Sequence, residues 1–275
     1  MTNELYAVVG NPISHSKSPR IHSLFAEQTG EAVEYTAIQA PLEGFETTVT
    51  SFFERGGRGL NVTVPFKERA WQMASRRTDR AAAAGAANTL YLDSEGSLTA
   101  DNTDGAGLVT DLTINHGIAL ADTRILILGA GGAVRGVLGP LLAARPASIT
   151  IANRTLARAE ALVDLFAGQA GETRLEACEF RAADAPMDLV INGTSASLQG
   201  DLPPLSPAVL GPDTVVYDMM YSLQTTTFNQ WALEQGATRV FDGLGMLVEQ
   251  AAESFQVWRG VRPQTAPVID ALRND

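Results

Sequence analysis

The stretch Ile-Leu-Ile-Leu-Gly-Ala-Gly-Gly-Ala-Val-Arg-Gly, residues 125–136, decides the predicted fold. Its four apolar residues are typical of a buried strand, and the glycines that follow indicate a tight turn before a helix. Gly129 permits the turn, while Gly131 and Gly132 would let a pyrophosphate approach the backbone at the helix N-terminus. Val134 occupies the third position of a Gly-x-Gly-x-x-Gly spacing, and an ordinary strand–helix turn also carries glycines. The surrounding sequence must therefore distinguish the two interpretations.

Regular alternation of apolar runs and helical stretches begins with this motif and continues after it. Helices are predicted at residues 133–144, 156–167 and 226–235. The apolar runs are residues 125–128, 149–152, 175–178, 189–192, 215–218 and 239–241. Several lack polar alternation, which is typical of parallel strands covered on both faces. The pattern predicts a doubly wound, Rossmann-type α/β domain and favours a dinucleotide site at the glycine turn.

The second predicted strand indicates which dinucleotide binds. An NAD site usually has an acidic residue after this strand, which holds the ribose 2′-hydroxyl. Here the strand ends Ala-Asn-Arg-Thr, and Asn153, Arg154 and Arg158 stand where the acid is expected. Guanidinium groups suit a 2′-phosphate, although most arginines on a helix simply face solvent. The absence of the acid favours NADP.

The first 120 residues form a less regular α/β pattern. Ser18 and Pro19 predict the N-cap and first residue of a helix that ends at Gly30. Further predicted elements are a helix at 45–53 closed by Gly56 and Gly57, a strand at 60–65, a hairpin of 89–92 with 97–100, and tail helices at 244–258 and 267–273. We expect the tail to complete the first domain. The predicted domains are 1–106 with 244–275, for substrate binding and catalysis, and 107–243, for the cofactor.

Composition limits the class of protein. The chain has 275 residues and a net charge of −11, which argues against nucleic acid or anionic lipid as a partner. It has no apolar run of about 20 residues, and its first residues lack the basic segment of an export signal. Cys178 is the only cysteine, so no intrachain disulfide forms. These features predict a cytoplasmic protein with a small-molecule substrate, as a monomer or homodimer.

Polar side chains follow the predicted strands of the first domain. Residues 11–19, Asn-Pro-Ile-Ser-His-Ser-Lys-Ser-Pro, come after the apolar run at 6–9 and suit either a turn with a helix cap or a grip on an anion. Lys67 and Asp104 each follow a strand, where α/β proteins place ligands. A lysine near a carboxylate can exchange a proton with an alcohol or ketone, although each residue alone is more often a surface charge. The three histidines show no metal-ligand spacing, so no metal is expected.

Seven motifs together carry a resemblance to a known family. They are NPISHSKSP, NVTVPFK, ANTL, DNTDG, GAGGA, NRTxxRA and DGLGMLVEQA, which occur in this order between Asn11 and Ala251. The ordered set resembles the shikimate dehydrogenases, NADP-dependent enzymes that interconvert 3-dehydroshikimate and shikimate in aromatic amino-acid biosynthesis. The resemblance covers nearly the whole chain.

The resemblance implies a role for each matching residue. Lys67 and Asp104 would be the acid/base pair. Ser16 and Ser18 would bind the substrate carboxylate, with Tyr221 nearby. The ring hydroxyls would be held by Asn61, Thr63, Asn88, Asp104 and Gln250. NADP would be bound by Gly129, Ala130, Gly131, Gly132, Ala133, Asn153, Arg154, Thr155, Arg158, Thr194, Met219 and Gly243.

A few positions depart from the family pattern. Val134 and Gly193 stand where a small residue and an alanine are usual, Ser197 replaces a glycine, and Thr227 replaces a proline. Two alternatives also stay open. One is a relative that acts on quinate or an aminated shikimate with NAD, a cofactor that Arg154 and Arg158 argue against. The other is a catalytically silent NADP sensor, which the presence of Lys67 and Asp104 argues against.

Overall fold

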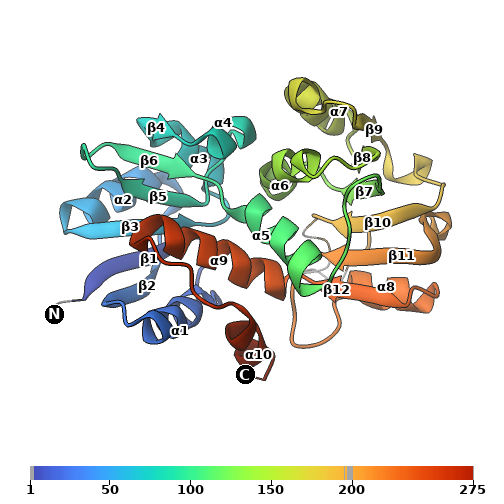
Figure 1. Ribbon diagram of the computed structural model, residues 1–275. Coiled ribbons are helices and arrows are strands. Elements are labelled where there is room, and N and C mark those ends of the chain that lie inside the picture. Colours follow the sequence, from blue (N-terminus) through green and yellow to red (C-terminus); the bar gives the residue numbers. More distant parts are fainter. Residues whose placement is uncertain (1–2, 195, 197–200, 275) are drawn as a thin grey trace. The chain divides into compact units, whose positions relative to one another are not determined.

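The computed structural model describes residues 3–194, 196 and 201–274, and the chain divides into two compact units (Figure 1). Unit 1 comprises Met1–Gly107 and Leu247–Asp275, and unit 2 comprises Leu108–Met246. Each boundary therefore falls inside a helix, α5 (Asp104–Thr110) or α9 (Leu244–Arg259). No helix among the described residues has the length and apolarity to cross a membrane.

Unit 1 contains a mixed six-stranded sheet in the order β2-β1-β3-β5-β6-β4. Its strands are β1 (Glu4–Gly10), β2 (Val33–Gln39), β3 (Gly57–Val62), β4 (Arg76–Arg77), β5 (Thr89–Leu92) and β6 (Leu98–Asp101). Strands β1, β2 and β3 run parallel, whereas β5 is antiparallel to both β3 and β6. The predicted hairpin is confirmed as β5 and β6.

The helices of unit 1 follow or precede these strands. They are α1 (Ser18–Thr29), α2 (Phe45–Glu54), α3 (Lys67–Met73), α4 (Asp79–Ala84), the start of α5, most of α9, and α10 (Ala266–Asn274). The core of unit 1 is formed by apolar side chains from β1, β3 and α2. Among them, Val9, Leu60 and Phe45 are fully buried. Both predicted tail helices are present, and both belong to this unit apart from the first residues of α9.

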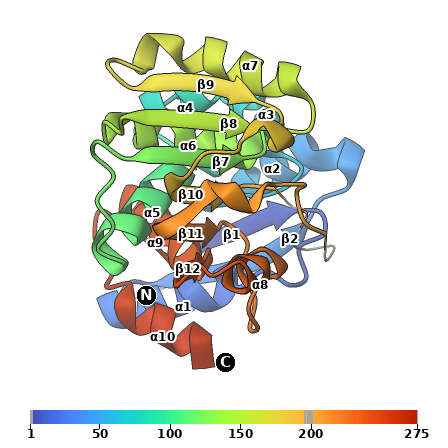
Figure 2. The same cartoon turned by 90° about the vertical axis from the view of Figure 1, so that its right-hand side faces the viewer.

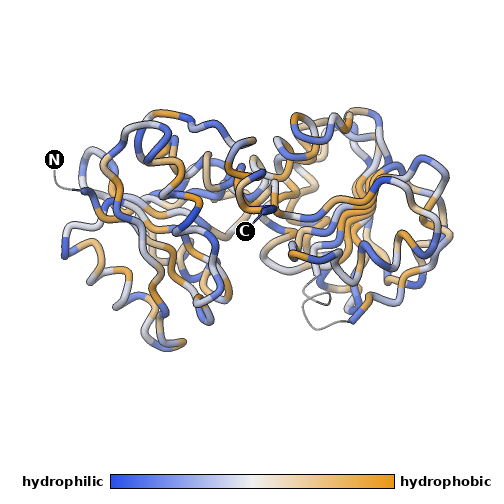
Figure 3. Tube along the Cα trace, turned by 90° about the horizontal axis from the view of Figure 1, so that it is seen from below, coloured by the Kyte–Doolittle hydropathy of each residue, from blue (hydrophilic) through white to orange (hydrophobic). Residues whose placement is uncertain are grey.

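Unit 2 contains a parallel six-stranded sheet in the order β12-β11-β10-β7-β8-β9, which Figure 2 shows in side view. Its strands are β7 (Arg124–Leu128), β8 (Ser148–Ala152), β9 (Arg174–Cys178), β10 (Met187–Asn192), β11 (Leu210–Asp218) and β12 (Arg239–Asp242). The helices α6 (Gly132–Ala143), α7 (Leu156–Phe166) and α8 (Thr227–Glu234) connect them. The strands form the apolar band of this unit in Figure 3. The predicted fold class is confirmed.

Several predicted boundaries in unit 1 are wrong. The strand expected at 60–65 is β3, which begins at Gly57 and ends at Val62. Lys17, not Ser18, precedes the first residue of α1, and the Ser18 hydroxyl makes no capping bond. Instead the Ser18 N–H donates to Oγ of Ser16, at 3.3 Å, and the Ser18 hydroxyl meets that of Tyr35 on β2. Gly57 does not close α2, since β3 begins there and the ring of Phe52 fills the space that a side chain at 57 would need.

Candidate functional site

Lys67 and Asp104 form the central contact of unit 1. Lys67 is the first residue of α3 and Asp104 the first of α5, so both follow the strand ends as predicted. Lys67 Nζ donates to Asp104 Oδ2 over 2.5 Å. Asp104 is only 5% exposed, which shields the pair from bulk water. An ammonium held by one carboxylate oxygen keeps two further N–H groups for a substrate oxygen.

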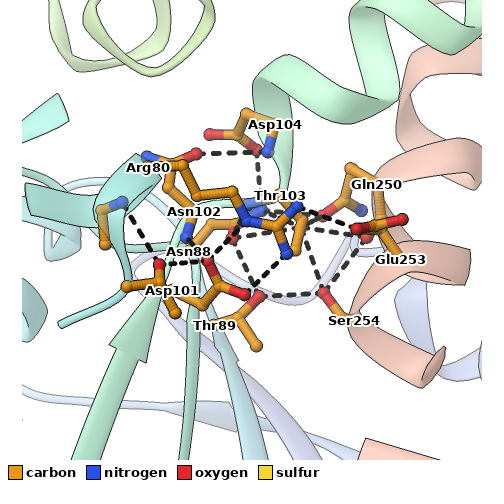
Figure 4. A network of polar contacts seen from close by, with 12 residues as sticks. Arg80, Asn88, Thr89, Asp101, Asn102, Thr103, Asp104, Gln250, Glu253 and Ser254 are labelled. Carbon is orange, nitrogen blue, oxygen red and sulfur yellow. Dashed lines mark hydrogen bonds and ion pairs between the residues drawn. The ribbon is translucent and has the colours of Figure 1, made fainter. Parts of the chain in front are cut away.

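The side-chain amide of Asn88 supports the other oxygen of this carboxylate (Figure 4). Asn88 Nδ2 donates to Asp104 Oδ1 over 2.9 Å and to Gln250 Oε1 over 3.0 Å. Asn88 Oδ1 accepts the backbone N–H of Thr103 over 2.8 Å, which fixes the orientation of the amide. Asn88, Asp104 and Gln250, three residues that the sequence predicted for substrate binding, therefore meet at one place.

Asn61 lies at the end of β3 on the same network. Its Nδ2 donates to the Asn88 carbonyl over 3.2 Å and to Ser254 Oγ over 3.0 Å, and its Oδ1 accepts the Tyr35 hydroxyl over 2.7 Å. Burial raises the pKa of Tyr35 well above 10, while the hydrogen bond to Ser18 acts in the opposite direction. Tyr35 thus links the serine stretch to the asparagines.

An ion pair braces the strand that leads to Asp104. Asp101 ends β6 and accepts two hydrogen bonds from the Arg80 guanidinium, each 2.6 Å long. Burial alone would raise the pKa of Asp101, but the bonds from Arg80, from the Thr78 hydroxyl and from the Asn102 N–H lower it. Arg80 also donates to Glu253 on α9 over 2.8 Å (Figure 4). The ion pair between Arg80 and Glu253 thus joins the two chain segments of unit 1 next to the site.

The glycine turn of unit 2 follows β7. Gly129 has φ of 103°, a conformation that L side chains rarely adopt. At Gly131 and Gly132 an added Cβ would meet nothing within 4 Å, so the space beside the backbone is open. Gly131 caps α6 without a side-chain bond, which leaves the first N–H groups of the 12-residue helix available. These features fit the pyrophosphate of a dinucleotide.

The residues after β8 fit the adenosine end. Asn153 Nδ2 donates to the Thr155 carbonyl over 2.9 Å, which shapes the turn into α7. Arg154 and Arg158 are exposed, and neither forms an ion pair with another residue in the described part of the chain. No carboxylate stands among residues 153–159, so the charge of this turn suits a 2′-phosphate.

Three further predicted cofactor residues gather at the ends of β10, β11 and β12. Thr194 donates through its hydroxyl to Asn192 Oδ1 over 2.7 Å, and Met219 N–H donates to the Asn192 carbonyl over 2.9 Å. A Cβ on Gly243 would lie 2.2 Å from the Met219 carbonyl oxygen, so only glycine fits there. The ends of these strands are therefore packed backbone against backbone.

Comparison with known proteins identifies the family. Three family models match: the shikimate dehydrogenase substrate binding domain over residues 8–90, shikimate / quinate 5-dehydrogenase over 112–199, and the shikimate 5'-dehydrogenase C-terminal domain over 243–273. The shikimate dehydrogenase (NADP(+)) of Marinobacter nauticus is 70% identical over 275 residues, which cover 100% of both chains. The chain belongs to the shikimate dehydrogenase family.

Solved structures of shikimate dehydrogenases and related enzymes agree with this assignment. Shikimate 5-dehydrogenase from Thermus thermophilus, in complex with NADP(H) and shikimate, is 32% identical with a TM-score of 0.86, over 98% of this chain and 99% of that one. An Ael1 enzyme from Pseudomonas putida is 47% identical with a TM-score of 0.91, over 98% of both chains. The resemblance inferred from the seven motifs is confirmed.

Four residues to which the shikimate dehydrogenase resemblance gave no role join the site. Tyr35, Thr89, Thr103 and Ser254 all bond to Asn61 or Asn88. Thr89 and Thr103 lie inside the motifs ANTL and DNTDG, where their hydroxyls were the only signal. Thr63 is half-buried after β3, and Tyr221 is half-buried after β11, where burial raises the pKa of its hydroxyl. The roles of Thr63 and Tyr221 stay predictions.

The departures from the shikimate dehydrogenase pattern have partial structural explanations. A Cβ on Gly193 would lie 2.4 Å from Val134 Cγ2, so the larger residue at 134 and the smaller one at 193 fit each other. Thr227 is the first residue of α8 after the N-cap Thr226, a position that suits proline but does not require it. Ser197 lies outside the described residues.

Proposed function

We propose that this chain catalyses the reversible, NADPH-dependent reduction of 3-dehydroshikimate to shikimate, with Lys67 and Asp104 as the acid/base pair. The observation that carries the proposal is the Lys67–Asp104 contact of 2.5 Å inside a network of predicted substrate-binding side chains. The shikimate dehydrogenase (NADP(+)) of Marinobacter nauticus, 70% identical over its full length, supports the same reaction.

Proton transfer is the task of Lys67. When bound, NADPH supplies the hydride that reduces the carbonyl carbon of the substrate. The Lys67 ammonium gives its proton to the carbonyl oxygen, which becomes the hydroxyl of shikimate, and takes it back in the reverse direction. The Asp104 carboxylate holds the Lys67 ammonium in place. The same carboxylate accepts a hydrogen bond from a substrate hydroxyl.

Substrate recognition falls to the polar side chains of unit 1. Ser16 would donate a hydrogen bond to the substrate carboxylate, and Ser18 would do the same once its hydroxyl turns from Tyr35 to the substrate. Asn61, Thr63, Asn88 and Gln250 bind the ring hydroxyls together with Asp104. Unit 1 is thus the substrate-binding and catalytic domain, and unit 2 is the NADP-binding domain.

NADP selectivity rests on Arg154 and Arg158. Both guanidiniums are exposed after β8 and would form charge-assisted bonds with the 2′-phosphate. The glycine turn at 129–133 binds the pyrophosphate. The rest of the cofactor site is lined by Asn153, Thr155, Thr194, Met219 and Gly243. The protein works in the cytoplasm, where NADPH is available, as a monomer or homodimer.

A spectrophotometric assay of the purified protein tests the proposal. Shikimate and quinate are each supplied with NADP and with NAD, and the near-ultraviolet absorbance of the reduced cofactor is followed. We expect the highest kcat/KM with shikimate and NADP. A higher kcat/KM with quinate or with NAD would instead favour the relative with altered specificity, and no turnover with any pair would overturn the proposal.

A further inference from the structure

Thr89 bridges the two asparagines of the site. It is the first residue of β5 and has no exposed surface. Its Oγ1 lies 2.8 Å from Asn88 Oδ1, 2.8 Å from Ser254 Oγ and 3.3 Å from Asn61 Nδ2. Ser254 on α9 is equally buried and accepts from Asn61 Nδ2 over 3.0 Å. Neither hydroxyl is therefore able to touch a substrate directly.

Backbone groups determine which way each amide points. Asn88 Oδ1 faces the Thr103 N–H, which only donates, and Asn61 Nδ2 faces the Asn88 carbonyl, which only accepts. Asn88 Oδ1 is thus an acceptor toward Thr89, so the single hydroxyl proton of Thr89 points to Asn88.

The Ser254 hydroxyl supports Thr89 from the other side. Two hydroxyl oxygens 2.8 Å apart need one proton between them, and the Thr89 proton is already used, so the Ser254 proton serves this contact. Ser254 Oγ also donates to the Gln250 carbonyl over 3.1 Å, so its single proton is shared between two acceptors, and the Thr103 hydroxyl donates to the same carbonyl over 3.0 Å. One chain of hydrogen bonds results, which runs from Asn61 through Ser254, Thr89 and Asn88 to Asp104. Figure 4 shows its last four residues.

We propose that Thr89 and Ser254 are positioning residues for catalysis, because they hold Asn88 so that its N–H is directed at Asp104 Oδ1. Hydrogen bonds linked in one direction polarise and strengthen one another in a buried site. The chain thereby holds Asp104, and through it the Lys67 ammonium, in the geometry that proton transfer needs. This inference rests on the proposed function of Lys67 and Asp104.

Two substitutions of Thr89 distinguish the effect of its hydroxyl from the effect of its packing. Thr89→Val removes the hydroxyl at nearly constant volume, and Thr89→Ser keeps it. We expect Thr89→Val to lower kcat with shikimate by about tenfold, the equivalent of one buried hydrogen bond, and to leave the KM for NADP unchanged. Thr89→Ser should restore kcat to within about twofold of the wild type, since the hydroxyl carries the effect.

A matched control excludes a general loss of stability. Thr173 in unit 2 is buried, and its hydroxyl donates to the Pro146 carbonyl over 2.8 Å. Thr173→Val should lower the melting temperature about as much as Thr89→Val while kcat stays at the wild-type value. Wild-type kcat in Thr89→Val, an equal loss in Thr89→Ser, or an equal loss in Thr173→Val would each overturn the proposal.

A readout without turnover distinguishes this inference from the proposed function. The side-chain amide protons of Asn88, followed by NMR with ¹⁵N-labelled protein, should exchange slowly with water in the wild type and in Thr89→Ser, and faster in Thr89→Val. An inactive wild-type protein would contradict the proposed function, yet the exchange rates would still decide the positioning role. Equal exchange in all three proteins would refute that role.

Discussion

The two units hold their proposed ligand-binding groups in opposite ways. In unit 1 the groups are side chains, and most of them are buried and already bonded to another, as Asn88 is to Asp104 and Gln250. In unit 2 they are backbone N–H groups at an open glycine turn and the exposed guanidiniums of Arg154 and Arg158. Each arrangement suits its proposed task.

The difference suggests that unit 1 orients reacting groups precisely, whereas unit 2 attracts a charged cofactor. Proton transfer depends on distances to within a fraction of an ångström, and a bonded network supplies such precision before the substrate arrives. Binding a charged cofactor needs donors and charge, which an open loop and flexible arginines provide with less order. A change in unit 1 should therefore alter turnover, and a change at the arginines should alter cofactor affinity.

The largest effect is expected from Lys67. Lys67→Ala removes the proposed proton donor and should lower kcat by ~10²–10⁴-fold with little change in NADP affinity. Glu68→Ala, at the next residue of α3, controls for disturbance of the helix because the Glu68 side chain is exposed. Steady-state kinetics check both. Near-normal kcat with a raised KM would assign Lys67 to binding alone and break the comparison.

A smaller effect is expected from the arginines of unit 2. Charge-assisted bonds contribute about 1.5–3 kcal/mol each, and exposure favours the lower value, so Arg154→Ala with Arg158→Ala should lower kcat/KM for NADP by about 100-fold. The value for NAD should change far less. Arg174→Ala, an exposed arginine on β9 paired with Glu176, is the control. Equal losses for the two cofactors would show that the arginines support folding and do not bind the phosphate.

The packing of Gly193 against Val134 should contribute to the free energy of unfolding. Gly193→Ala puts a Cβ against Val134 Cγ2 and should lower the free energy of unfolding by ~1–3 kcal/mol. Val134→Ala makes room, so the double variant should be more stable than the sum of the two single effects predicts. Denaturant unfolding of all four proteins tests this. Simple additivity would mean that the two positions are independent.

The smallest effect concerns His22 in unit 1. Its ring is buried and stacks on Tyr35 at a centroid distance of 4.1 Å, and burial lowers its pKa to about 3. Below its ordinary pKa of about 6.5, the unfolded chain binds a proton that the folded chain does not, so stability falls as the pH falls from 6.5 toward 3. Between pH 7.5 and 5.5 the loss should be about 1.4 kcal/mol.

Replacing the ring tests this assignment. His22→Phe should remove that loss from denaturant unfolding curves, since the aromatic stack stays and the titrating group is gone. His15→Gln should retain it, because His15 is exposed. A loss of the same size in His22→Phe would assign the acid sensitivity to another group.

Elements whose burial is regular were predictable from the sequence. The central strands β7, β10 and β11 of unit 2 end in runs of buried residues, so their apolar runs mark them clearly, and all six strands of the sheet are predicted from the sequence. Strand β2, Val33–Gln39, lies at the edge of the unit 1 sheet with only half-buried or exposed residues, and no apolar pattern indicated it. The prediction that Ser18 caps α1 is wrong because the Ser18 hydroxyl forms a hydrogen bond with Tyr35, a residue of that same strand.

The candidate site was predictable where residue types are unusual and unpredictable where they are common. Lys67 and Asp104 stood out as charges at strand ends. Thr89 and Ser254 did not, since a buried hydroxyl gains meaning only from its partner, and here the partners are 165 residues apart in the chain. Such a pairing depends on how α9 returns to unit 1, which local sequence does not specify.

The division of unit 1 into two segments has a consequence for the order of biosynthesis. A ribosome completes residues 1–107 and then the whole of unit 2 before it reaches Gln250, Glu253 and Ser254. Until then Asn88, Thr103 and Arg80 lack partners that the finished protein gives them. Unit 2 is continuous and can fold while the chain is still on the ribosome, whereas unit 1 is completed only when α9 has been made. A nascent chain released early would thus contain a folded unit 2 beside an incomplete unit 1.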